Sequence, residues 1–429
     1  MIFFYILVLS LPFVEHGLFG KEIFGLTLEK YLGLCCILYA LFYLRRRRTM
    51  PRVFAYGQAR FFAIYVFTAM VSYLVTSEEL IFKDLIGLFL SQFIFFLAVL
   101  ILVDSRERLE HALLMATASM GLISLYLLRE YAANVPIYGL AYRPGWVAGD
   151  PNMYTASALI VLPIMPYLMF HAARRWQRLL VFGCLGLTLL GILLAASRGG
   201  FIGLICVLAL QLRDARHRGR LIVAAVIILL VAFVSPYSPL DRLMHPTQSD
   251  QESSDARLRL WSVSEQIFLD HPVLGVGLWQ FPVYMKRYLA PGQELAFVVP
   301  HNTYLEAAVE LGTVGLAAFL AVIGFSLANL ARLRRAARRA GDEFMQAVST
   351  ALGSGIVGFC VAAFFLSAKH AKLFWFAVYL SCAVPALLQS KAAEETEAAE
   401  LEPAAEDSPS PASPPDSEAL RAGNWLTRH

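Results

Sequence analysis

The sequence has few charged residues and few cysteines. Asp, Glu, Lys and Arg make up 16% of the 429 residues, whereas hydrophobic residues make up 58%. This composition and the positive mean hydropathy exclude a soluble globular protein. The six cysteines lie in apolar runs without metal-ligand spacing, which argues against a disulfide framework or a metal centre; they are Cys35, Cys36, Cys184, Cys206, Cys360 and Cys382.

Two kinds of motif are absent as well. The N-terminal Met-Ile-Phe-Phe-Tyr lacks the basic leader and small-residue cleavage site of a signal peptide, so we expect it to be retained. The loops assigned below to the outer side contain no Asp-x-Asp motif and no His/Asp cluster. We therefore expect no metal and no other cofactor, with membrane lipids rather than nucleic acid as surroundings.

What the chain does have is a series of apolar runs, each near the roughly 20 residues that cross a bilayer. We predict an all-α polytopic membrane protein with about twelve transmembrane helices and one large polar loop. The predicted crossings are 2–19, 27–44, 60–77, 84–104, 110–130, 152–171, 178–196, 199–213, 220–236, 303–331, 345–367 and 371–390. Helices one to nine thus fall in 1–236, a loop with amphipathic helices in 237–302, and helices ten to twelve in 303–390.

The last segment, 391–429, is rich in Ala, Glu, Pro and Ser and has nine acidic residues against three basic ones. Such a segment cannot bury enough apolar surface to order itself. We expect it to be a disordered cytoplasmic tail without a part in the chemistry.

Basic residues fix the predicted orientation. Arginine clusters fall on alternate loops, which the positive-inside rule makes cytoplasmic: Arg45 to Arg48 with Arg52, Arg106 with Arg108, Arg174 with Arg175 and Arg178, Arg213 to Arg220, and Arg332 to Arg339. The outer side then receives 131–151, 197–199, 237–302 and 367–371. The cations left there are explained by an anionic ligand or by ion pairs with loop acids: Arg143, Arg198, Arg242, Arg257, Arg259, Lys286, Arg287, Lys369 and Lys372.

Several outer motifs could bind an anion. Asp150 and Pro151 are typical of an N-cap and a first helical residue, and the helix start would attract negative charge together with Arg143. A capped helix alone is the alternative. Arg198 lies in a predicted tight hairpin before Gly199 and Gly200, which would permit the turn and close approach of a ligand. A snorkelling arginine is the alternative there.

The large loop is expected to contain an amphipathic helix from Asp255 with Leu258, Trp261 and Ile267 on its apolar side. Gly275 and Gly277 are expected in turns. Tyr284, Lys286, Arg287 and Tyr288 follow and could contact phosphate or sugar.

His301 precedes a long apolar helix and shares the outer side with these arginines. A neutral imidazole can take a proton from a hydroxyl, although a helix cap is the alternative. Glu306 and Glu310 share one face of the following helix and should face protein, water or a ligand. The glycines behind, Gly312 and Gly315, are expected to let helices approach closely.

Together these motifs resemble the O-antigen ligase superfamily of lipopolysaccharide O-antigen ligases, O-antigen polymerases and protein O-oligosaccharyltransferases. The resemblance covers roughly residues 140–320 by motif and nearly the whole chain by topology. Its motifs are Arg143 with Asp150-Pro151-Asn152, Ser197-Arg198-Gly199-Gly200, Arg257 with Trp261, His-Pro-x-x-Gly-x-Gly at 271–277, and His301-Asn302-x9-Gly312-x-x-Gly315. Length and loop size look most like the ligases.

The resemblance implies a GT-C-like glycosyltransferase of the bacterial inner membrane with its active site facing the periplasm. Such an enzyme transfers a glycan from undecaprenyl diphosphate to a hydroxyl of lipid A–core, with inversion and without a metal. It implies His301 as the general base and Arg143, Arg198 and Arg287 as diphosphate ligands. Supporting residues would be Asp150, Asn152, Arg257, Asn302 and Glu306.

Three other function classes stay open. An O-antigen polymerase or a protein O-oligosaccharyltransferase would use the same donor with another acceptor. A lipid or polysaccharide transporter is a more distant alternative, because that class places ionisable groups near the bilayer midplane and often shows internal repeats. A non-catalytic scaffold would leave a histidine among outward arginines unexplained.

Overall fold

The computed structural model describes residues 1–13, 22–23, 26–47, 56–76, 82–139, 142–145, 150–214, 242, 244–289 and 299–401. By internal contacts the chain divides into two units, Met1–Leu388 and Gln389–His429. The described residues are almost all helical. The helices are α1 (Ile2–Ser10), α2 (Leu28–Arg47), α3 (Gly57–Thr76), α4 (Phe82–Leu102), α5 (Arg106–Tyr138), α6 (Pro151–Val161), α7 (Met165–His171), α8 (Arg175–Ala195), α9 (Arg198–Asp214), α12 (Gln248–Asp270), α13 (Phe281–Tyr288), α14 (Thr303–Arg339), α15 (Glu343–Ala362) and α16 (Lys372–Leu401).

The part of the first unit that the structure describes also contains shorter elements. Strands β1 (Glu22–Ile23) and β2 (Leu26–Thr27) pair antiparallel. Three 3₁₀ turns in this part extend or join helices: η1 (Leu11–Phe13), η3 (Leu162–Ile164) and η4 (Ala363–Phe365).

Seven described helical segments are long and apolar enough to cross a membrane. They are Gly57–Thr76, Asp84–Leu102, Arg106–Tyr138, Pro151–His171, Arg175–Ala195, Thr303–Arg339 and Glu343–Phe365. Ile2–Phe13 and Lys372–Pro385 are shorter apolar helices, and α2 and α9 occupy two further predicted crossings. The predicted helical membrane protein is thereby confirmed. The predicted crossing at 220–236 and the end of the first one lie outside the described residues.

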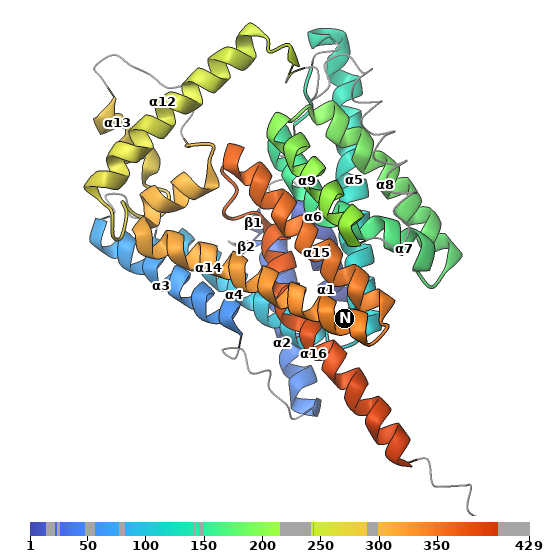
Figure 1. Cartoon of the computed structure of the whole chain (residues 1–429). Coiled ribbons are helices and arrows are strands. Elements are labelled where there is room, and N and C mark those ends of the chain that lie inside the picture. The colour runs from blue at the N-terminus through green and yellow to red at the C-terminus, as the bar shows by residue number, and fades with distance from the viewer. Residues whose placement is uncertain are drawn as a thin grey trace, which may run out of the picture. The chain divides into compact units, whose positions relative to one another are not determined.

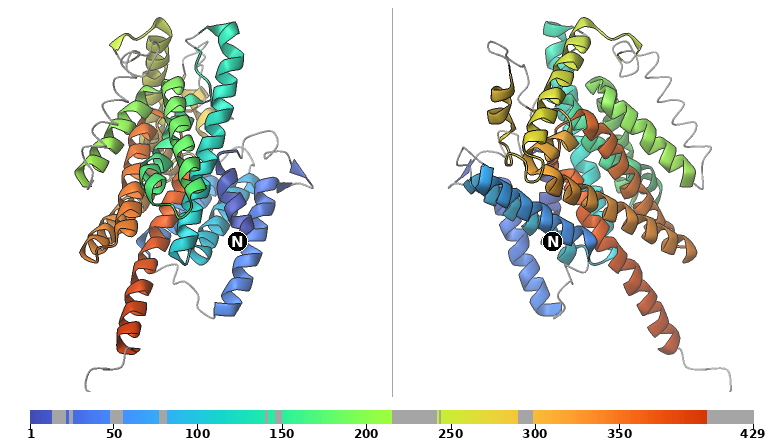
Figure 2. Two further views of the ribbon diagram at one scale, coloured as in Figure 1. Left: turned by 90° about the vertical axis from the view of Figure 1, so that its right-hand side faces the viewer. Right: turned by 60° about the vertical axis from the view of Figure 1, so that its left-hand side comes forward.

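Small residues allow two of these helices to pack closely. A Cβ atom built on Gly203 in α9 would lie 2.6 Å from the carbonyl oxygen of Gly358 in α15. Because lipid tails are as apolar as leucine, membrane helices associate through close van der Waals contact at small residues. Helix α15 also packs against α6 and α14, and α14 packs along α3, as the views in Figures 1 and 2 show.

Helix α14 is broken at Gly312, which has φ 64° and ψ −167°. The loop after α12 lies against this break. The N–H groups of Val276 and Gly277 donate to the carbonyl oxygens of Val309 and Glu310, each at 2.9 Å, and the Thr313 N–H donates to the Pro272 oxygen at 2.8 Å. The loop thus satisfies backbone groups that a broken helix would otherwise leave unpaired within the membrane.

The role expected for Gly312 was therefore wrong. It admits a loop rather than another helix, because its Cβ would lie 2.1 Å from the Val273 carbonyl oxygen. At Gly315 an added Cβ would meet the Leu311 side chain of the same helix at 2.2 Å. The turn positions of Gly275 and Gly277 are confirmed by φ values of 71° and 98°.

Gly312→Ala is expected to destabilise the protein by at least about 1–3 kcal/mol, the usual cost of a left-handed non-glycine residue, since overlap with the loop adds to it. Gly324→Ala is the matched control in the same helix, because nothing lies within 4 Å of a Cβ at that position. Thermal unfolding of both variants in detergent measures the difference. Equal melting temperatures for the two variants would contradict the account of the break.

Helix α12 is longer than predicted and begins with a capping box, in which the Thr247 side chain accepts from the Asp250 N–H. Its buried side consists of Leu260, Val263 and Ile267, which pack with the loop and α13. Leu258, expected on that side, is instead 60% exposed. The prediction was wrong for Leu258 because the helix has a second apolar face: Leu258 and Trp261 line a cavity, whereas Ile267 packs on the buried side.

The final described helix, α16, ends at Leu401, so helical structure continues past residue 390, where we expected the tail to begin. Residues 402–429 lie outside the described residues.

Candidate functional site

A cavity of about 330 Å³ lies where the start of α6, the turn between α8 and α9, α12 and η4 come together. Among the described residues, four arginines line it: Arg143, Arg198, Arg242 and Arg257. Trp261, Phe365, Leu258 and Ile202 supply apolar parts of the wall. The cavity thus combines a cationic region with an apolar one.

The turn between α8 and α9 places one of these arginines. Ala196 ends α8 in the left-handed conformation with φ 46°, and α9 begins at Arg198. Gly199 and Gly200 are helical residues that pack against Phe365 and Thr155, where an added Cβ would overlap. The prediction that these glycines form the turn was wrong, since Ala196 forms it.

Asn152 connects this turn to the segment before α6. The Ser197 hydroxyl donates to Asn152 Oδ1 at 2.8 Å, and Arg143 Nη2 donates to the same oxygen at 3.4 Å. Arg143 Nε also donates to the Ala195 carbonyl at 2.9 Å. The predicted N-cap is confirmed, because Asp150 accepts from the Asn152 N–H at 2.8 Å.

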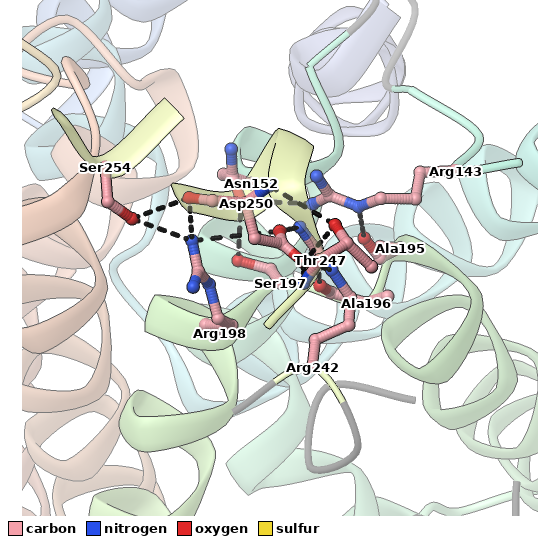
Figure 3. A network of polar contacts seen from close by, with 10 residues as sticks. All are labelled: Arg143, Asn152, Ala195, Ala196, Ser197, Arg198, Arg242, Thr247, Asp250 and Ser254. Carbon is pink, nitrogen blue, oxygen red and sulfur yellow. Dashed lines mark hydrogen bonds and ion pairs between the residues drawn. The ribbon is translucent and has the colours of Figure 1, made fainter. Parts of the chain in front are cut away.

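Two further arginines meet Asp250 in the first turn of α12. Arg242 forms an ion pair with the Asp250 carboxylate and donates to the Ala196 carbonyl at 2.6 Å. Arg198 Nη2 donates to the Ser254 hydroxyl at 3.3 Å and lies 3.8 Å from the Asp250 carboxylate. Figure 3 shows the guanidinium groups of Arg143, Arg198 and Arg242 around Asn152, Ser197 and Asp250.

The electrostatics of the cavity are cationic. Burial and the neighbouring Arg242 lower the pKa of Arg143 to about 9, so this group is still protonated at neutral pH. Burial and the nearby Arg198 also lower the pKa of Arg257. Although burial alone would raise it, hydrogen bonds from Arg242 and Thr247 hold the pKa of Asp250 below its ordinary value. Among the described residues, Asp250 contacts these guanidinium groups and Asp150 acts on Arg143 and Arg257, so two carboxylates against four guanidinium groups leave a surplus of positive charge for an anionic ligand.

His301 lies beside this cavity and not in its wall. The indole Nε1–H of Trp261, which does line the cavity, donates to the carbonyl of Pro300 at 2.9 Å. Burial and then the charge of Arg257 lower the pKa of His301, against opposing effects of Asp150 and Glu306. The imidazole is therefore neutral at pH 7, which is the form that can accept a proton.

The residues after His301 are fixed by hydrogen bonds. Asn302 caps α14, accepting from the N–H groups of Tyr304 and Leu305 at 3.0 and 3.1 Å. Thr303 Oγ1 donates to the Leu366 carbonyl at 2.6 Å, and Tyr304 donates to the Cys360 carbonyl at 2.7 Å. The start of α14 is thus attached to the end of α15 and to η4.

Glu306 and Glu310 face a buried cation. Lys369 Nζ lies 2.6 Å from Glu306 Oε1 and 2.5 Å from Glu310 Oε2, and the lysine is only 1% exposed. Lys372 likewise pairs with Glu29. The two lysines thus pair with carboxylates of helices rather than with loop acids, whereas Arg242 and Arg198 pair with Asp250 of the large loop, as the ion-pair alternative expected.

The other predicted contacts lie apart from the cavity wall. Arg287, in α13, stacks over the Tyr284 ring at 4.7 Å, and Tyr288 donates to Asp270 at 2.6 Å. The structure thus gathers Arg143, Arg198 and Arg257 but places Arg287 elsewhere. Within the described part of the chain, no group of three or more His, Cys, Asp or Glu residues is arranged to hold a metal ion.

Sequence reasoning assigned no role to Asp250 or Ser254 and named Arg242 only among the outer cations, yet all three complete the cavity network. A signal was present: positions 250, 254, 257 and 261 fall on one face of a helix. The sequence analysis began this helix at Asp255, which left out positions 250 and 254. The structure shows that α12 begins at Gln248 and so includes them.

Fold and site together define a membrane-embedded helical protein with a cationic cavity next to a neutral histidine. Residues 183–320 match the sequence model of the O-antigen ligase family. The match contains Arg198, Arg257 and His301, and it confirms the resemblance to the O-antigen ligase and polymerase superfamily. The class of activity that this supports is that of O-antigen ligases and polymerases. No curated protein matches the chain.

Proposed function

We propose that this protein is an O-antigen ligase, which transfers a glycan from undecaprenyl diphosphate to a hydroxyl of lipid A–core. The observation that carries the proposal is the gathering of Arg143, Arg198, Arg242 and Arg257 around one cavity beside His301. Guanidinium groups bind phosphate oxygens through paired N–H donors. A diphosphate group carries the negative charge that the surplus of cations in this cavity would attract.

The reaction we propose is a single displacement with inversion. His301 takes the proton of the acceptor hydroxyl, whose oxygen forms a bond to the anomeric carbon. The bond from that carbon to the diphosphate oxygen breaks, and the diphosphate leaves with the electron pair. The arginines stabilise this developing negative charge, which is the part of the barrier that fixed cations lower most. No metal is needed for the step.

The same proposal includes a membrane topology with twelve crossings. Twelve crossings would place the cavity, α12 and His301 on the periplasmic side of the inner membrane and the C-terminal tail in the cytoplasm. A GT-C-like arrangement follows from that topology. The arginine-rich loops on the alternate side support this orientation.

Deletion of the gene, followed by gel analysis of lipopolysaccharide, tests the proposed function. Loss of all long chains with accumulation of lipid-linked polymer is expected for a ligase. Cores that carry a single repeat unit would instead indicate an O-antigen polymerase, and unchanged lipopolysaccharide with an under-glycosylated protein would indicate a protein O-oligosaccharyltransferase.

Arg198→Ala is expected to raise the KM for the diphosphate donor by on the order of ten- to a hundredfold, as for loss of a hydrogen bond to a charged group. Arg259→Ala is the matched control, because Arg259 lies on α12 with an exposed side chain. Transfer assays with purified protein and varied donor concentration measure both. Equal donor KM values in the two variants would remove Arg198 from the phosphate site.

A further inference from the structure

Helix α12 presents a row of polar and aromatic side chains to the site. Asp250, Ser254 and Arg257 fall three or four residues apart, which places them on one face of the helix. Asp250 and Ser254 contact the cavity arginines, and Arg257 is one of those arginines. Trp261 continues the same face, one turn further on.

Trp261 contacts both the arginine cavity and the segment that carries His301. Its ring forms part of the cavity wall, and its indole N–H donates to the Pro300 carbonyl at 2.9 Å. The indole is held from the side by the Phe364 ring, with centroids 5.5 Å apart in an edge-on arrangement. The indole thus contacts a neighbouring ring on one side and the backbone before His301 through its N–H.

The accepting carbonyl directly precedes the histidine. His301 has φ 51°, a left-handed conformation that a non-glycine residue keeps only where its surroundings impose it. After His301, the Asn302 cap and the Thr303 hydrogen bonds fix the chain. Before His301, the bond from Trp261 fixes it. The histidine is thus a strained residue held on both sides.

We propose that Trp261 is a positioning residue for the base: its indole N–H holds the peptide between Pro300 and His301, so that the imidazole keeps its place beside the arginine cavity. This inference rests on the proposed role of His301. It also makes α12 the element that aligns the phosphate-binding arginines with the base.

Trp261→Phe tests the proposal, because phenylalanine keeps an aromatic ring in the wall while it loses the N–H donor and part of the size of the indole. We expect kcat to fall on the order of ten- to a hundredfold, the size of effect that small misplacement of a reacting group produces. The donor KM should change little, as for an interaction with the base alone. Trp176→Phe is the control, since Trp176 is exposed at the far end of α8 from the cavity.

Two outcomes of this assay would overturn the proposal. A higher donor KM with unchanged kcat would mean that Trp261 is only a wall of the cavity. Unchanged kinetics would mean that the hydrogen bond has no influence on the base.

A double variant separates positioning from a general structural effect. In a His301→Asn background, Trp261→Phe is expected to leave the residual rate unchanged, because the base it positions is gone. A further fall by the same factor as in the wild type would show that Trp261 acts through something other than His301, and would overturn the proposal.

A measurement without turnover distinguishes this inference from the proposed function. Carbethoxylation of His301 by diethyl pyrocarbonate, followed by mass spectrometry, should be faster in Trp261→Phe, with the exposed His171 unchanged as an internal reference. Equal rates at His301 would overturn the inference. A wild-type protein that transfers no glycan, together with faster carbethoxylation in the variant, would refute the proposed function while supporting the positioning role.

Discussion

His301→Asn and His301→Ala should each reduce glycan transfer by on the order of a hundred- to ten-thousandfold, the usual contribution of a general base, while the protein stays in the membrane. Asparagine tolerates the left-handed backbone at this position better than other residues, so His301→Asn isolates loss of the base from loss of fold. Transfer assays and quantification of the membrane fraction measure the two effects. His171→Ala, at an exposed position in α7, is the control.

The pH profile sharpens this prediction. The proposed base would act in its neutral form, and the pKa of His301 lies below the ordinary value because of burial and the charge of Arg257. Activity should therefore be full near pH 7 and fall as the pH drops through that lowered pKa. Normal transfer by His301→Asn, or a rate that is flat across this acidic range, would remove the base assignment.

Lys369→Met should have the largest effect on stability. It would leave the carboxylates of Glu306 and Glu310 together in a buried site with their shared cation removed. Removing one partner of a buried ion pair costs about 3–5 kcal/mol. The expected result is a much lower melting temperature in detergent, or loss of folded protein from the membrane.

Two comparison variants identify the cause of that loss. Lys372→Met removes a partly exposed pair with Glu29 and should cost no more than about 1 kcal/mol. Adding Glu306→Gln and Glu310→Gln to Lys369→Met removes the unpaired charges and should recover part of the stability. If Lys369→Met and Lys372→Met melt alike, the lysine does not neutralise the two carboxylates.

Local patterns in the sequence predicted the elements well. Apolar runs predicted the membrane helices, because a bilayer-spanning segment must satisfy its own backbone and present apolar side chains. Asp150 predicted its helix start for an equally local reason, since an N-cap depends only on the next few residues. The positive charge of the alternate loops predicted that Arg143, Arg198 and Arg257 lie on the same, outer side of the membrane. The structure places these three arginines around one cavity.

The remaining features depend on contacts between distant segments. The ion pair of Lys369 could not be predicted, because its partner Glu306 lies 63 residues before it in the chain. The network of Arg242 with Asp250 and Ala196 joins three elements, and no periodic pattern reports such a meeting. Arg287 was grouped with the phosphate ligands by its predicted loop and its guanidinium group, whereas its stacking on Tyr284 depends on the short helix α13.

The interruption of α14 has a consequence for biogenesis. The segment that carries His301 is bonded across the break to residues 272–277, which are synthesised before α14 itself. Because the donors and acceptors of these bonds lie on both segments, the bonds can form only after residues 272–277 and the start of α14 have both been synthesised. A product truncated before Gly312 would lack Thr313, and with it the bond from the Thr313 N–H to the Pro272 oxygen that joins the far side of the break to the loop.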